Sequence, residues 1–225
     1  MIKLLSFKTR HPDLTHGAFR EHYEESHVPL GLSFIERFRW RRYVRNYVVE
    51  PVLGSVDFDC VTEFWVSGRQ DQERIAEFVG SPAFRVLDED DRRFLDVTRR
   101  LSFEVEEHLL SGAKLDSAPR DAHRLAMFIT KPGAMRAAEF VANVAEEARS
   151  FATRHCDDFD TIALDLRAPG SGEEAGIYAM LSLWTPGRDG LEDLVWQGIG
   201  SSVSVVRLDA AQTPSEALFR ESEEE

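Results

Sequence analysis

The sequence has 225 residues, which corresponds to one or two domains, and 43% hydrophobic residues provide enough apolar surface for folded cores. Forty acidic side chains against 27 basic ones give a formal net charge of −13. Such a charge repels phosphate backbones and anionic lipid surfaces, so we expect neither nucleic acid nor a membrane as a partner.

The N-terminal residues, MIKLLSFKTRHPD, begin with a strand pattern and not with an apolar signal region. No stretch approaches the roughly 18 apolar residues that a membrane helix needs. We therefore predict a cytoplasmic protein without an export signal.

Hydrophobic spacing in the first half of the chain predicts the order strand, helix, strand, strand, helix, strand. These six elements cover residues 3–9, 14–29, 41–49, 58–68, 71–96 and 99–110.

A similar pattern restarts after residues 111–122, a segment with Gly, Pro and Ser that we interpret as a linker. RLAMFIT (124–130) matches KLLSFKT (3–9) at an offset of 121 residues, and WTPGR (184–188) matches WVSGR (65–69) at an offset of 119 residues. Two matches at nearly one offset indicate an internal duplication. The elements predicted for the second copy are a helix at 134–155, strands at 161–168 and 177–184, a shorter helix at 191–200 and a strand at 202–209.

The repeated order predicts an α+β fold of two tandem ferredoxin-like (β-α-β-β-α-β) units, residues 1–112 and 122–212. Helices cover one face of each sheet and leave the other face to be buried. We therefore expect the two units to pack sheet to sheet as a pseudo-symmetric sandwich or barrel. Such a chain would do alone what a homodimer of single units does, and a homodimer of the tandem unit stays open as a further partner.

Metal and cofactor sites are not indicated by the sequence. Only two cysteines occur, Cys60 and Cys156, and neither belongs to a C-x-x-C pair, which excludes a zinc knuckle. No phosphate-binding glycine loop precedes a predicted helix. The acidic run DEDD at 88–91 suggests a cation site, but consecutive acids point around a helix, and we interpret the run as a solvated face. We therefore predict no metal and no cofactor.

The stretch FREHYEESHVPL, residues 19–30, contains the best candidates for chemistry. His22 and His27 are five residues apart, which separates them by about 140° on an α-helix and excludes the shared zinc of an H-E-x-x-H motif. Pro29 predicts that the helix ends by Val28, with His27 in its last turn. There the helix dipole and burial act on the imidazole in opposite directions, so it can titrate near its ordinary pKa of about 6.5. Acid–base catalysis and a purely structural, hydrogen-bonded histidine are both open.

Three stretches of the first half resemble the EthD family of dimeric α/β-barrel proteins: FREHYEESHVPL, RYVRNYV (42–48) and SPAFRVLDEDDRRFLD (81–96). The resemblance covers residues 1 to about 110 and implies a ferredoxin-like fold with a pocket between sheet and helices. Relatives act as cofactor-independent cyclases, dehydratases, decarboxylases or isomerases on polyketide-like or aromatic compounds, and many have no known activity.

Individual residues match the motifs of that family. His27 takes the position of the histidine in H-x-P-L, and Tyr43 and Asn46 take the Y and N of a strand motif close to Y-V-Q-N-H. Arg45 and Tyr47 replace the glutamine and the histidine of that motif. Strand alternation turns Tyr43 and Asn46 to opposite faces, so they cannot both line one pocket unless a bulge intervenes.

Our leading hypothesis is a cofactor-independent lyase, isomerase or cyclase that acts on a small hydrophobic, oxygenated compound. His27 would move the proton, His22 or Tyr23 would orient it or the substrate, and Tyr43 and Trp65 would line the cavity, with Asn46 as a further candidate for substrate binding. The alternatives are a non-catalytic binding or oxygenase-accessory protein, a cofactor-free monooxygenase, and haem binding through His22 or His27. The second copy has no H-x-P-L after His155, so we expect the chemistry in the first half alone.

Overall fold

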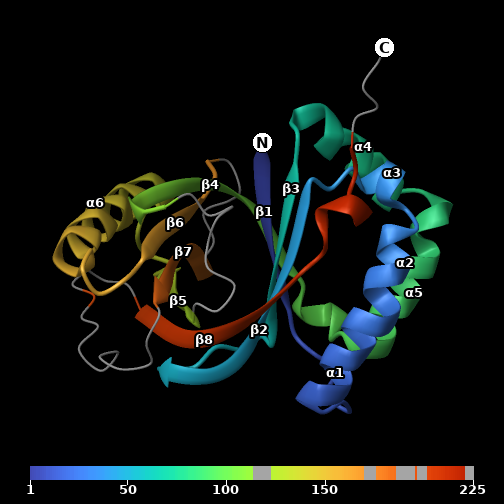
Figure 1. Cartoon of the computed structure of the whole chain (residues 1–225), viewed down its shortest axis with the longest axis horizontal. Coiled ribbons are helices and arrows are strands. Elements are labelled where there is room, and N and C mark those ends of the chain that lie inside the picture. Colours follow the sequence, from blue (N-terminus) through green and yellow to red (C-terminus); the bar gives the residue numbers. More distant parts are fainter. Residues whose placement is uncertain (114–122, 170–175, 186–195, 197–201, 221–225) are drawn as a thin grey trace. The chain divides into compact units, whose positions relative to one another are not determined.

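A computed structural model describes residues 1–113, 123–169, 176–185, 196 and 202–220 (Figure 1). Most of the predicted linker and of the predicted helix at 191–200 lies outside the described residues, as does the end of WTPGR. The strands are β1 (Ile2–Lys8), β2 (Arg42–Leu53), β3 (Cys60–Val66), β4 (Leu101–Gly112), β5 (His123–Lys131), β6 (Thr161–Arg167), β7 (Gly176–Thr185) and β8 (Ser202–Gln212). The α-helices are α1 (His16–His22), α2 (Val28–Leu32), α3 (Ile35–Phe38), α4 (Arg69–Val79), α5 (Arg85–Phe94) and α6 (Ala137–His155).

The strands hydrogen-bond in the order β1-β3-β2-β8-β5-β7-β6-β4 and close into one antiparallel barrel. The prediction of two tandem ferredoxin-like units packed sheet to sheet is therefore wrong. β4, from the predicted first half, pairs with β6, from the predicted second half, so that Val105 lies opposite Arg167 and Gly112 lies opposite Thr161. Closure satisfies the backbone N–H and C=O groups that two open sheets would leave at their edges. The internal duplication stays a prediction.

The chain forms two compact units, each assembled from distant parts of the sequence. Unit 1 contains Met1–Tyr47, Asp57–Ser102 and Ala210–Glu225, and unit 2 contains Val48–Val56 and Phe103–Asp209. The predicted division into domains 1–112 and 122–212 stays a prediction. None of the helices in the described residues is long and apolar enough to cross a membrane.

Unit 1 packs its helices against one face of the strands β1, β3 and β2. Leu4 lies opposite Phe64, and Tyr43 lies opposite Phe64 on the other side, so the three side chains share that face. In Figure 1 α1 and α2 follow one another end to end next to these strands, and α5 runs beside them. Aromatic side chains dominate the core between them, including Phe19, Tyr23, Phe38, Trp40, Tyr43, Phe78 and Phe94. This aromatic layer surrounds the candidate active site.

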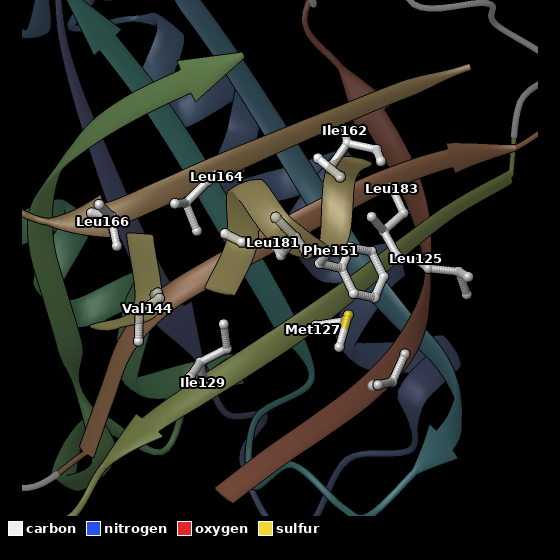
Figure 2. Packing of buried hydrophobic residues seen from close by; sticks show 14 of the residues in the cluster. Leu125, Met127, Ile129, Val144, Phe151, Ile162, Leu164, Leu166, Leu181 and Leu183 are labelled. Carbon is white, nitrogen blue, oxygen red and sulfur yellow. The ribbon is translucent and has the colours of Figure 1, made fainter. Parts of the chain in front are cut away.

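Unit 2 has an aliphatic core. Phe140, Val144, Ala148 and Phe151 recur at helical spacing and place one buried stripe of α6 against the sheet. Figure 2 shows Val144 and Phe151 over leucine, isoleucine and methionine side chains of three strands. The labelled partners are Leu125, Met127 and Ile129 of β5, Ile162, Leu164 and Leu166 of β6, and Leu181 and Leu183 of β7.

Gly112 at the end of β4 allows a close approach of two backbone segments. Its φ is +85°, and a Cβ atom there would lie 1.9 Å from the carbonyl oxygen of Asp160. We expect Gly112→Ala to lower the free energy of unfolding by more than about 1 kcal/mol and the Tm by several degrees. The reason is that alanine strains both the backbone conformation at residue 112 and the contact with Asp160. Gly68→Ala is the control, since Gly68 has an extended φ of −178° and a Cβ atom there would meet no other atom within 4 Å. Equal melting temperatures for the two variants would contradict this account.

Candidate active site

The helix that carries both histidines changes its winding between them. α1 ends at His22, a π-helical turn spans Tyr23–His27, and α2 continues to Leu32. The N–H of Val28 donates to the carbonyl oxygen of Tyr23, which is the i→i+5 bond of a π-helix. The predicted end of the helix at Val28 is therefore wrong, because Pro29 lies in the first turn of α2, where its missing N–H is tolerated. Single π-helical turns inside α-helices are frequent at functional sites.

The wider turn brings both histidines to one carboxylate. His22 Nε2 lies 3.0 Å from Asp90 Oδ1, and His27 Nδ1 lies 2.9 Å from Asp90 Oδ2. The separation of about 140° expected from an α-helix does not hold across this turn. His22 and His27 thus act together, although their common partner is an aspartate and not a metal ion.

Asp90 and its neighbour Asp91 come from the buried face of α5. They are 5% and 8% exposed and share that face with Leu87 and Phe94, at the spacing i, i+3, i+4 and i+7. The interpretation of DEDD as a solvated face is therefore wrong for these two acids. Asp88, by contrast, is the partner of Arg92 on the outer side of the helix. The i, i+3, i+4, i+7 pattern around the acids is the signal that could have found them.

The His27 ring is fixed on several sides. Its centroid lies 4.9 Å from that of Phe94 and 5.4 Å from that of Tyr23. A carboxylate only accepts hydrogen bonds, so Asp90 selects the tautomer with the proton on Nδ1 and leaves Nε2 as the basic nitrogen. Nε2 lies 3.7 Å from Asp91 Oδ1. Burial lowers the pKa of His27 below its ordinary value, while Asp91 and Asp90 act in the opposite direction. The imidazole is therefore neutral and basic at pH 7.

His27 and Asp91 line a cavity of about 240 Å³ within unit 1. Drug-sized ligands occupy cavities of about 300–1,000 Å³, so this one suits a smaller compound. The walls are mainly apolar and aromatic, with Leu4, Phe38, Trp40, Phe64, Ile75, Phe84 and Leu87 among them. The polar side chains that line it are Lys8, Tyr23, His27, Tyr43, Asp91 and Ser102. A few polar groups in an apolar cavity are typical of a small-molecule site.

Tyr23 and Tyr43 supply two phenol groups to the cavity. The Tyr23 hydroxyl lies 2.7 Å from Thr62 Oγ1. Burial raises the pKa of Tyr23 and of Tyr43 well above that of an exposed tyrosine. Both groups are therefore neutral at pH 7 and can donate a hydrogen bond to an oxygen atom of a ligand.

Three of the six predicted site residues line this cavity, namely His27, Tyr23 and Tyr43. His22 is not among the lining residues and is linked to His27 through their common partner Asp90. Asn46 and Trp65 are buried but are not among the lining residues. The Asn46 amide donates to the carbonyl of Val61 and to Glu63, as expected from a strand in which Tyr43 and Asn46 face opposite ways. Sequence reasoning did not identify Lys8, Asp90 or Asp91.

The segment that carries most of the site matches a known protein family. Residues 11–98 match the family model of the EthD domain. This match contains His27, Asp90, Asp91 and both cavity tyrosines, and we call the segment the EthD domain. No curated protein sequence matches the chain.

Solved structures with a similar fold cover nearly the whole chain. An anthrone oxidase-like protein has a TM-score of 0.55 at 10% identity, over 94% of this chain and 92% of its own. A proposed monooxygenase from Lactobacillus acidophilus has a TM-score of 0.48 at 7% identity, over 95% of this chain and 96% of its own. A haem-binding protein from Thermus thermophilus has a TM-score of 0.46 at 13% identity, over 96% of this chain and 92% of its own. At such low identity the likeness to the first of these shows a common fold only.

Haem does not fit the site of the EthD domain. A cavity of about 240 Å³ is smaller than those of drug-sized ligands, and haem is larger than most such ligands. Asp90 also occupies the Nε2 atom of His22. At His27 the size of the cavity carries the argument, because Nε2 of this ring stays open. Among the described residues, no group of three or more His, Cys, Asp or Glu side chains is placed to hold a metal ion.

Proposed function

We propose that the EthD domain binds a small aromatic compound and removes a proton from it, with His27 as the general base. The observation that carries the proposal is the His27–Asp90 pair, whose imidazole lines a mostly apolar cavity. A cavity built only to retain an apolar compound has no need of a neutral imidazole oriented by a buried carboxylate. General base assistance of this kind contributes roughly 100- to 10,000-fold to a rate.

The other polar groups of the cavity support this role. Removal of a proton next to a carbonyl group moves negative charge onto the carbonyl oxygen, and the neutral phenols of Tyr23 and Tyr43 can donate hydrogen bonds to it. His22 holds the second oxygen of Asp90 and thus positions the carboxylate without touching the ligand. Return of the proton to another atom would make the protein an isomerase, and loss of a hydroxyl group would make it a lyase or cyclase.

A second candidate is an oxygenase or oxygenase-accessory function, for which the fold likeness to an anthrone oxidase-like protein is the reason. Anthrone has an acidic CH₂ group next to its aromatic rings. Once that group is deprotonated, molecular oxygen can oxidise it: anthrone and O₂ give anthraquinone and water. Both candidates share the first step at His27 and differ in the fate of the resulting carbanion.

Anthrone therefore serves as the test compound. We expect the protein, incubated with anthrone in D₂O without oxygen, to incorporate deuterium into the CH₂ group faster than buffer does, as measured by NMR. Oxygen consumption in air would then favour the oxygenase. Saturable binding without accelerated exchange would contradict the proposed base and support a sequestering protein instead.

A further inference from the structure

Among the described residues that line the cavity, Lys8 is the one whose charge has no direct partner. It lies on the same face of β1 as Leu4, and both side chains line the cavity next to His27. Within the residues that the structure describes, the Lys8 ammonium makes neither an ion pair nor a side-chain hydrogen bond. Burial lowers the pKa of Lys8, and the charge of Asp91 opposes this effect. A cation in such a cavity is unfavourable unless an anion joins it.

The two lysines that are buried in the described chain, Lys3 and Lys131, are satisfied. Lys3 forms an ion pair with Glu63 at 3.1 Å, and Lys131 donates to the carbonyl oxygen of Met135 at 2.8 Å. Asp91, the nearest acid to Lys8 in the cavity, is instead within 3.3 Å of Arg100. The fold therefore satisfies these two buried cations and leaves the partly buried Lys8 ammonium available to the cavity.

We infer that Lys8 is a specificity-determining residue that pairs with an ionised oxygen of the ligand, so that the cavity selects aromatic compounds with a carboxylate, phenolate or enolate oxygen. The inference rests on the proposed function and narrows its substrate class. The aromatic walls, among them Trp40, Tyr43 and Phe64, suit the ring system. The same ammonium would stabilise the oxyanion that forms when His27 removes a proton.

The test compares an anion with a neutral compound of the same shape. We expect 2-naphthoate to bind the protein about 10- to 100-fold more tightly than 2-naphthamide in calorimetric titrations, since hydrogen bonds to charged groups are worth that much. Lys8→Met should remove this preference and leave the affinity for the amide nearly unchanged. Lys8→Arg keeps the positive charge and should retain part of the preference for naphthoate. This variant controls for an effect of altered folding.

Arg92→Met is the matched control, because Arg92 lies on α5, has a 60% exposed side chain, pairs with Asp88 and is absent from the cavity lining. It removes one positive charge near the site and should leave the preference intact. If Lys8→Met still prefers naphthoate while deuterium exchange continues, the inference about Lys8 is wrong and the proposed function stands. If neither compound binds and no exchange occurs, both fail together.

Discussion

Replacing His27 by glutamine should slow deuterium exchange into anthrone by about 100- to 10,000-fold, the range that general base catalysis supplies. Glutamine can still donate a hydrogen bond to Asp90, so the packing of the π-helical turn against α5 should survive. Its amide cannot accept a proton at neutral pH, and the base is lost. The measurement is the exchange rate by NMR at saturating anthrone, with circular dichroism and the melting temperature as evidence of folding.

The pH dependence provides an independent readout for the same variant. Because burial lowers the pKa of His27, the base form persists below pH 6.5, and the exchange rate should fall only as the pH drops through the lowered pKa. The unfolded chain, with an ordinary histidine pKa of about 6.5, binds the proton first. The free energy of unfolding should therefore fall as the pH drops from about 6.5 towards the pKa of the folded state. His27→Gln should remove this part of the pH dependence.

His155 is the control for the His27 prediction. Its Nδ1 lies 2.8 Å from Asp158 Oδ2, and its ring centroid lies 4.5 Å from that of Phe151, so it has the same kinds of partner in unit 2. His155→Gln should leave the exchange rate unchanged within about twofold, since general base catalysis needs contact with the bound ligand. An equal loss in both variants, or a fully active His27→Gln protein, would refute the assignment.

Local patterns predicted the parts of the site that local interactions determine. Thr15, a residue type that is favoured at this position, caps α1, and its hydroxyl accepts a hydrogen bond from the N–H of Ala18. Strand alternation placed Tyr43 on the opposite face from Asn46, and Tyr43 lines the cavity while the Asn46 amide donates to Glu63 on the other face. These features depend on residues within one element.

Features that depend on distant segments were not visible in the sequence. The π-helical turn has no propensity signal of its own, and here the shared carboxylate of Asp90, more than 60 residues further along the chain, accompanies it. Barrel closure likewise depends on pairing between strands as distant as β4 and β6, while alternation specifies faces and not partners.

Buried polar residues were the hardest to assign to a face. Glu63 is 3% exposed, pairs with Lys3 and accepts from Asn46, while the ammonium of Lys3 lies 4.8 Å from the ring of Trp65. These residues lie on the face of the strands opposite the cavity, although Asn46 and Trp65 were predicted to contact the substrate. A polar residue in a strand thus predicts a hydrogen-bonded partner, but the partner can be protein or ligand.

Asp90→Asn should reduce the exchange rate by between about 10- and 10,000-fold, because the carboxylate positions His27 and selects its tautomer. Asparagine offers one acceptor oxygen where the carboxylate offers two, so it cannot accept a hydrogen bond from both His22 and His27. Where the amide NH₂ faces His27, Nδ1 must accept, the proton moves to Nε2, and the base is lost. Asp88→Asn, on the outer side of the same helix, should leave the rate unchanged.

The pH profile of Asp90→Asn separates this positioning role from a structural one. The negative charge of Asp90 raises the pKa of His27 against the larger effect of burial, so its removal should move the acid limb of the residual exchange rate to lower pH. A residue that only stabilised the fold would lower the melting temperature and leave that limb in place. The double variant His27→Gln/Asp90→Asn should be no slower than His27→Gln alone, since the two residues act as one unit. An unchanged rate and an unmoved acid limb in Asp90→Asn would show that His27 works without its carboxylate.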